Sequence, residues 1–268
     1  MTQLATRTSN DAARSASRLR IVGTSGTLIS LTVGLVIWQL LSMRYDPSTL
    51  PGPQSTARAA WDLIEDGTLL DSTIASMKRI AIGWALGVIV GVPVGLVVGE
   101  IPWVRRLLDP YLQFFRFVPP ISLVTLAIIW FGIGESSKIF LIFYTTVFVI
   151  VLNTVAGTLS VDQSRIQAAR TFGANRFQVL TTIILPSVIP HIVVGARLAM
   201  GNSFLTIVSA EIVAAQVGLG SLIWTARNYG QTEWVFVGII TLGLLGLIID
   251  SAIRWISRTL LSRFEVPA

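Results

Sequence analysis

Few side chains in this sequence are of the types that carry out covalent chemistry. The chain contains no cysteine and a single histidine, His191, which excludes disulfides and thiolate metal sites and leaves little for an imidazole-based site. No carboxylates are clustered along the chain, so a membrane-embedded enzyme is a poor hypothesis. We therefore expect no catalytic residue, no metal site and no cofactor in this chain.

One short segment, GESSK at residues 134–138, superficially resembles a nucleotide-binding loop. A phosphate-binding loop needs Gly directly before its Lys and Ser or Thr directly after it, and Ser137 and Ile139 occupy those places here. No other segment matches that motif. The sequence therefore predicts that this polypeptide does not itself bind ATP by that route.

The composition is that of a membrane protein. Hydrophobic residues make up 53% of the chain and charged residues 13%, with a mean hydropathy of +0.72. A soluble domain of this length could not bury so much apolar surface. The net charge of +6 would also suit nucleic acid, but the basic residues lie in the gaps between apolar runs, as in membrane proteins. We expect no nucleic-acid partner.

The apolar runs predict an all-α membrane protein with about six transmembrane helices. Residues 21–43 carry no charge and exceed the ~20 residues needed to span a bilayer, so they predict the first span rather than a signal peptide. An outer interfacial segment (44–73) and a core of five further spans (74–259) are expected to follow. The five spans are predicted at residues 74–99, 110–131, 139–158, 189–213 and 234–253, with a short inner loop at 100–109.

Basic side chains set the expected orientation. They are about twice as numerous in the predicted inner segments as in the outer ones, which favours cytoplasmic termini, with tails at residues 1–20 and 260–268. Lys78 and Arg79 run against this rule.

Glycine and proline mark contacts and bends inside the spans. Five glycines recur every four residues and predict close helix packing, which we favour over pore lining. Pro93 predicts a kink, and Pro119-Pro120 predicts a break that either borders a path or is an ordinary bend. Arg116, one turn earlier, is expected at the inner interface. The glycines are Gly83, Gly87, Gly91, Gly95 and Gly99.

The predicted fifth span has one narrow face of small or hydrogen-bonding residues. This face either lines a path at a dimer axis or packs against another helix. Arg197 and Glu211 point elsewhere and are ~21 Å apart along a helix, so each needs another partner. The face comprises Gly195, Ala199, Asn202, Thr206 and Ser209.

A helix-turn unit at residues 158–188 lies between the predicted fourth and fifth spans. Asp162 is a candidate N-cap for a first helix ending at Phe172, and Gly173 can supply the left-handed residue that ends it. A second helix is expected to begin near Asn175 and to stop near Pro186. Because arginines and a small apolar face occur together here, we interpret the unit as a docking surface rather than a span.

Residues 167–186 of this unit, QAARTFGANRFQVLTTIILP, are similar to the EAA loop of bacterial ABC-importer permeases. Gln167 stands where that family usually has Glu. Other segments, including IWFGIGESSK at 129–138 and GARLAM at 195–200, look like the sulfonate, taurine and nitrate branch. Thr125 and Val149 stand where that branch usually has proline. The matching positions are Ala168, Ala169, Gly173, Ile183, Leu185 and Pro186.

The resemblance implies a type I ABC-importer permease that forms a translocation path by alternating access for a small anion. It implies separate ATPase subunits inside, a periplasmic or lipid-anchored solute-binding protein outside, a second permease copy and a location in the bacterial inner membrane. The alternative is a self-contained secondary transporter, which would need midplane ionisable residues and internal repeats. The expected ATPase-coupling residues are Gln167, Ala168, Ala169, Arg170, Gly173, Ile183, Leu185 and Pro186; the expected path residues are Pro119, Pro120, Asn202, Thr206 and Ser209.

Overall fold

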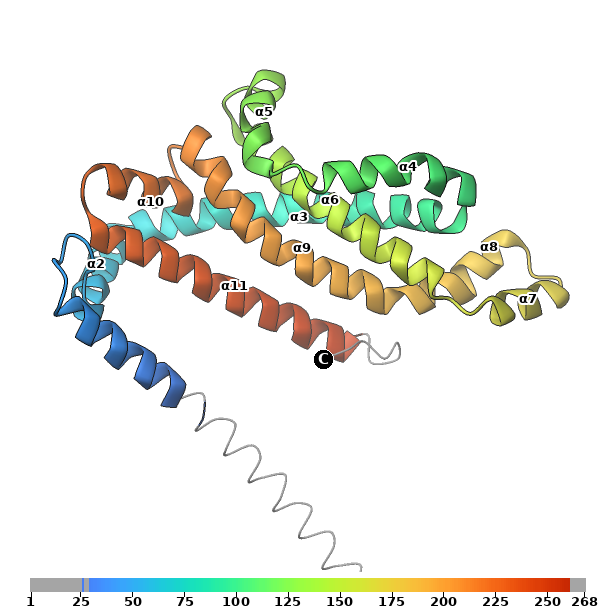
Figure 1. Cartoon of the computed structure of the whole chain (residues 1–268), viewed down its shortest axis with the longest axis horizontal. Helices are drawn as coiled ribbons and strands as arrows, with labels where there is room; N and C mark the ends of the chain where they lie inside the picture. Colours follow the sequence, from blue (N-terminus) through green and yellow to red (C-terminus); the bar gives the residue numbers. More distant parts are fainter. Residues whose placement is uncertain (1–25, 27–28, 261–268) are drawn as a thin grey trace, which may run out of the picture.

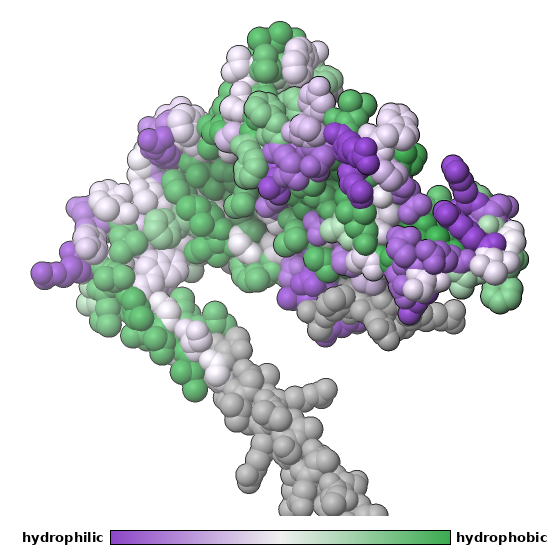
Figure 2. All heavy atoms as spheres, turned by 45° about the vertical axis from the view of Figure 1, so that its right-hand side comes forward, coloured by the Kyte–Doolittle hydropathy of each residue, from purple (hydrophilic) through white to green (hydrophobic). Residues whose placement is uncertain are grey.

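The computed structural model describes residue 26 and residues 29–260. The predicted tail at residues 1–20, the start of the predicted first span and most of the tail at 260–268 lie outside the described residues. Every regular element in the described part is helical, and broad hydrophobic areas cover the face seen in Figure 2. Both observations agree with the predicted all-α membrane class.

Four helices in the described residues are long and apolar enough to cross a membrane, and a bent pair would make five. The apolar helix Ile29–Ser42 is the described part of the predicted first span. The elements are α2 (Pro53–Glu65), α3 (Thr68–Glu100), α4 (Pro102–Phe115), a 3-10 turn (Pro120–Leu123), α5 (Val124–Phe131), α6 (Glu135–Leu159), α7 (Gln163–Thr171), α8 (Arg176–Val179), a π-helical turn (Leu180–Ile184), α9 (Leu185–Ala214), α10 (Leu219–Asn228) and α11 (Thr232–Leu260).

Two predicted boundaries are wrong, and a proline explains each. The expected inner loop at 100–109 is instead the first half of α4, because Pro102 starts the helix at a position that needs no backbone N–H. The helix expected to stop near Pro186 continues as one candidate span, Arg176–Val213. Pro186 directly follows the π-helical turn that joins α8 to α9, and this local change of helical pattern accommodates its missing N–H inside a continuous helix.

The predicted break at Pro119-Pro120 is confirmed. The chain bends by 92° between the segments Pro102–Phe115 and Pro120–Phe131. Pro119 has an extended backbone and precedes the 3-10 turn, as expected of a residue that is itself followed by proline. The bend places α5 at one edge of the molecule (Figure 1), where Val124 and Ala127 pack with Leu141 of α6 and Ala210 of α9.

The five regularly spaced glycines pack α3 against α6, so the predicted helix packing is confirmed. A Cβ atom built on any of them would come within 2.8 Å of a side chain of α6. Since no real Cβ atom tolerates such a contact, only glycine permits this separation of the two helices. The facing pairs are Gly83 and Ile142, Gly87 and Thr146, Gly91 and Ile150, Gly95 and Thr154, and Gly99 and Thr158.

A buried ion-pair network, called here the Arg79 cluster, joins α3, α6, α9 and the start of α10. The Glu211 side chain is fully buried and that of Arg79 is 6% exposed. Arg79 Nη1 donates to Glu211 Oε1 at 2.6 Å, while its Nε and Nη2 donate to Glu135 at 2.6 and 2.7 Å. Ser76 Oγ and the Gly220 N–H also donate to Glu211, at 2.8 Å each. Arg79 therefore neutralises the buried Glu211 and pairs with the more exposed Glu135, which accounts for its departure from the charge rule.

Arg197 has a different partner, as the helical spacing required. Its Nε lies 3.2 Å from Asp250 Oδ1, which joins α9 to α11. Asp250 also pairs with Arg254 at 3.1 Å. Both groups of the Arg197 pair retain exposure, 22% and 37%, so this pair is more weakly held than the Arg79 cluster.

Candidate functional site

The first helix and the turn of the helix-turn unit have the geometry that the sequence predicts. Asp162 is the N-cap of α7, and its Oδ1 accepts a hydrogen bond from the Ser164 N–H at 2.8 Å. That bond lowers the pKa of Asp162, so its carboxylate is ionised near neutral pH. Gly173 has φ of 84°, and its N–H donates to the Arg170 carbonyl at 2.9 Å. The left-handed glycine ends α7 as expected.

The second helix begins at a capping box. The Asn175 side chain accepts from the Gln178 N–H, the Gln178 side chain accepts from the Asn175 N–H, and both distances are 2.8 Å. This exchange satisfies two backbone donors that would otherwise be free at a helix start. Because α8 continues into α9, the helix that leaves the turn is the end of a candidate span 38 residues long. The turn is therefore joined to α9 without an intervening loop.

One side of the unit is buried. Val161, Ile166, Val179, Ile184 and Val188 form an apolar cluster. The predicted coupling residues Ala169 and Ile183 pack on it, and Leu185 and Pro186 are half-buried. Ala169 and Ile183 therefore hold the unit against the membrane helices.

The other side of the unit is exposed. Gln167, Ala168, Arg170 and Gly173, the remaining predicted coupling residues, are all exposed. Phe172 and Phe177 flank the turn and are 91% and 72% exposed; we call them the Phe pair. Phe177 was not singled out from the sequence, although a phenylalanine two residues after a capping asparagine is a usable signal. We take the Phe pair as the candidate interaction surface of the unit.

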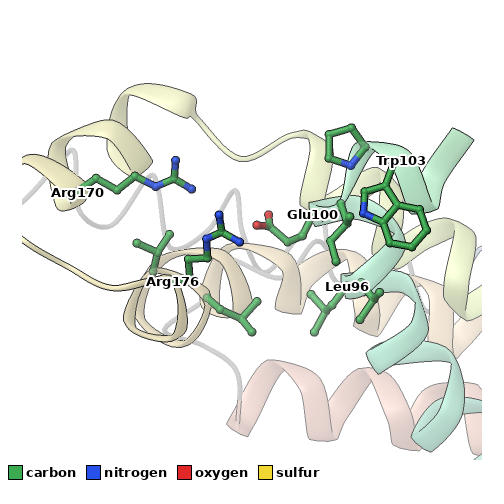
Figure 3. A pocket seen from close by; sticks show the side chains of 10 residues that line it. Leu96, Glu100, Trp103, Arg170 and Arg176 are labelled. Atoms are coloured by element: carbon green, nitrogen blue, oxygen red, sulfur yellow. The ribbon is translucent and has the colours of Figure 1, made fainter.

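A cavity of about 520 Å³ separates the unit from the turn between α3 and α4. In Figure 3 the guanidinium groups of Arg170 and Arg176 point toward the Glu100 carboxylate. Trp103 and Leu96 supply part of an apolar wall. With two positive groups and one negative group, this cavity can accept an acidic or amide side chain of a partner.

The five predicted path residues do not form one site in the single chain. Pro120 and Asn202 line the same cavity, of about 430 Å³. Thr206 is buried, with its hydroxyl 3.0 Å from that of Thr145 on α6, and Ser209 lines a separate cavity between α9 and α11. Pro119 is exposed at the bend.

Four polar residues that the path prediction omitted line the cavity of Pro120 and Asn202. They are Arg116, Tyr144, Thr145 and Asn153. Part of the small face of α9 packs on α6, because a Cβ atom at Gly195 would lie 2.8 Å from the Asn153 side chain and Ala199 is fully buried. The face therefore combines helix packing with one cavity-lining amide, that of Asn202.

The structure is thus an all-helical membrane chain with an exposed helix-turn unit at the end of a long span. The chain belongs to the family described as binding-protein-dependent transport system inner membrane component, whose model matches residues 87–262. The permease resemblance predicted from the EAA-like segment is thereby confirmed. The chain is a transport component of an ABC transporter, embedded in the membrane.

Two relatives from Escherichia coli (strain K12) match over most of their length. The taurine transport system permease protein is 35% identical over 244 residues, which cover 89% of this chain and 87% of the relative. The putative aliphatic sulfonates transport permease protein is 39% identical over 231 residues, covering 85% and 88%.

The fold also occurs in a solved ABC importer. An inward-facing structure of the MetNI methionine ABC transporter aligns with a TM-score of 0.65 and 21% identity, covering 72% of this chain and 95% of that chain. At this identity the likeness shows the fold alone. The fold is that of a type I ABC-importer permease, as the resemblance implied.

Proposed function

We propose that this chain, paired with a second copy, forms the translocation path of an ABC importer for a small anion of the sulfonate or taurine type. Solute arrives from a periplasmic or lipid-anchored binding protein, and separate ATPase subunits hydrolyse ATP on the cytoplasmic side. The substrate class is supported by the taurine and aliphatic sulfonate names of the two relatives. The binding protein is supported by the family description.

The geometry of the helix-turn unit carries this proposal. The exposed Phe pair and Gln167 provide a surface for an ATPase subunit, while the buried side of the unit is fixed to the membrane helices. Because α8 and α9 are continuous, closure of an ATPase pair moves α9 with the unit. The interface between the two permease copies then has two states, one open to each side of the membrane. The nucleotide bound to the ATPase subunits decides which state is favoured, and this gives alternating access.

The proposed orientation places both termini in the cytoplasm of a bacterial cell. Labelling in intact cells tests it, since the chain has no native cysteine. Cysteines at Thr8 and Ser262 should resist a membrane-impermeant thiol reagent, whereas a cysteine at Ser55 should react. The reverse pattern would contradict the topology and, with it, the cytoplasmic position of the helix-turn unit.

Transport itself is tested with the purified complex in vesicles. We expect ATPase and solute-binding subunits to co-purify with this chain and radiolabelled taurine or ethanesulfonate uptake to require ATP. A variant of the co-purified ATPase that binds but does not hydrolyse ATP is the control. Uptake by this chain alone, driven by an ion gradient, would instead support a secondary transporter.

A further inference from the structure

Arg116 lies on the surface of the single chain, level with the middle of α6. Tyr144 Oη donates a hydrogen bond to the Phe115 carbonyl at 2.5 Å, which fixes the residue before Arg116 against the middle of α6. Tyr144 is nine residues after Glu135, the first residue of that helix. At 1.5 Å per residue it is ~14 Å from the near end of α6 and ~22 Å from the far end. Arg116 therefore lies far from either membrane surface, not at the inner interface as its place in the sequence predicted.

Arg116 has no acidic partner in the described part of the chain. Its guanidinium lies 4.5 Å from the centre of the Phe117 ring, and the side chain is on the surface of the single chain. An unpaired charge at this depth is too costly to face lipid and is found where helices enclose water or a ligand. The face that carries Arg116 is therefore covered by protein or opens into an aqueous path.

The cavity beside Arg116 has the chemistry of an anion site. Arg116 is the charged residue of its lining, and none of the other lining residues is acidic. The side-chain amide of Asn202 makes no hydrogen bond within the described chain. The Asn153 amide donates one N–H to the Val149 carbonyl at 2.8 Å, and its second N–H is available to a ligand. Phe117 and Phe148 add apolar surface. A guanidinium binds two oxygens of one anion at once, and the amides can donate to a third.

We propose that Arg116 is the anion-recognising residue of the translocation path, in a transient site for a sulfonate-like head group that a second copy of this chain completes. The inference rests on the proposed function and gives the path its specificity residue. The volume of about 430 Å³ lies within the usual range for small-ligand sites. The apolar ring surfaces suit the short alkyl portion of an alkanesulfonate.

Thiol chemistry tests the site without knowledge of the transported solute. In the natively cysteine-free chain, Asn202→Cys is modified in open membrane fragments by two reagents of similar size. One, 2-sulfonatoethyl methanethiosulfonate, is itself an alkanesulfonate anion, and the other is its trimethylammonium analogue. Each rate is divided by the rate with a free thiol in solution, and the ratio of anionic to cationic reagent is compared between backgrounds.

We expect the ratio at Asn202→Cys to exceed one and to fall about tenfold when Arg116→Gln is added, because a unit charge at close range changes both rates in opposite directions. Arg116→Lys should keep most of the preference. Gln54→Cys, exposed on α2, should react with both reagents at a ratio that Arg116→Gln leaves unchanged. Asn153→Cys provides a second reporter if the first variant is poorly produced.

Two outcomes would overturn the proposal. One is that both cavity cysteines are inert while Gln54→Cys reacts, which would mean that the cavity is closed to water. The other is an unchanged ratio in the Arg116→Gln background. Neither depends on the ATPase, whose association with the chain is measured separately by co-purification, so failure of the anion site and failure of the proposed transport function are distinguishable.

Discussion

The two ends of the long helices are built in opposite ways. At one end, where α10 begins (Figure 1), the Arg79 cluster buries Glu211 completely and satisfies it with three donating groups. At the other end, the helix-turn unit leaves the Phe pair in the open. Within one chain, the groups at the first end find all their partners, whereas the apolar side chains at the second end remain uncovered. This contrast separates residues that hold the fold from residues that await a partner.

The two regions should differ in how much a substitution changes the stability of the protein. A buried charge that loses its partner is left desolvated and uncompensated, whereas an exposed side chain can usually be replaced with little effect on stability. Substitutions at the Arg79 cluster should therefore change the free energy of unfolding. Substitutions on the exposed side of the helix-turn unit should change association and coupling instead.

The largest effect is expected for Arg79→Met, which leaves Glu211 buried and unpaired. We expect the free energy of unfolding in detergent to fall by about 3–5 kcal/mol, measured by denaturant titration. Adding Glu211→Gln should recover part of the loss, because the orphaned charge is removed. Arg197→Met, whose pair is partly exposed, should cost about 1 kcal/mol or less. Equal losses for the two arginines would remove the distinction between a buried and a peripheral pair.

A somewhat smaller effect is expected at the α3–α6 contact. A Cβ atom at Gly87 would lie 2.3 Å from Thr146 Cγ2, so Gly87→Ala should destabilise the protein by about 1–3 kcal/mol through overpacking. Thr146→Gly in the same chain should relieve it, because Thr146 Cβ would also lie 2.5 Å from the added methyl group. Gly243→Ala on α11 is the matched control, since nothing lies within 4 Å of its added methyl group. A neutral result at Gly87 would mean that the two helices separate freely.

Gly173→Val should affect coupling more than folding. The positive φ of 84° costs a β-branched residue about 1–3 kcal/mol of local strain, and the strain is relieved by reorienting α7 relative to α8. We expect normal amounts in the membrane but weakened ATPase binding or hydrolysis without uptake, measured side by side in vesicles. Gly173→Asn, which tolerates this conformation, is the control. Normal, binding-protein-stimulated transport by the valine variant would show that the turn does not couple.

The smallest change in stability is expected at the exposed surface. Phe172→Ala and Phe177→Ala should each alter the free energy of unfolding by no more than about 0.5 kcal/mol yet reduce co-purification of the ATPase. Gln167→Glu should be mild in both measurements, because the side chain is exposed and a carboxylate keeps the acceptor oxygen of the amide. If the phenylalanine variants retain the ATPase fully, the docking surface lies elsewhere.

Local chemistry decides which features the sequence could predict. The caps at Asp162 and Asn175 and the turn at Gly173 depend on neighbours within three residues, so their patterns are readable. Pro102 begins a helix and Pro186 lies inside one beside a π-helical turn. A proline can end a helix, begin one or be accommodated within one, and only the surrounding chain selects between these roles.

The cavity of Arg116 could not be predicted for a related reason. Its depth depends on the bond from Tyr144 to Phe115, residues 29 positions apart, and on the 92° bend that follows. Linear span boundaries place Arg116 near a surface, whereas the fold places it beside Asn202. Helical periodicity describes one helix at a time, so it cannot predict which residues of different helices lie side by side.

The glycine contacts between α3 and α6 have a further consequence. Because they repeat every four residues on both helices, sliding α3 by one turn along α6 would bring four of its five glycines opposite a side chain that already faces a glycine. The periodic contact therefore permits more than one alignment of the same two helices. Arg79 on α3 and Glu135 on α6 form a paired contact that occurs once. Sliding α3 by one turn would break this ion pair. The ion pair therefore selects the observed alignment of α3 on α6 among the near-equivalent ones.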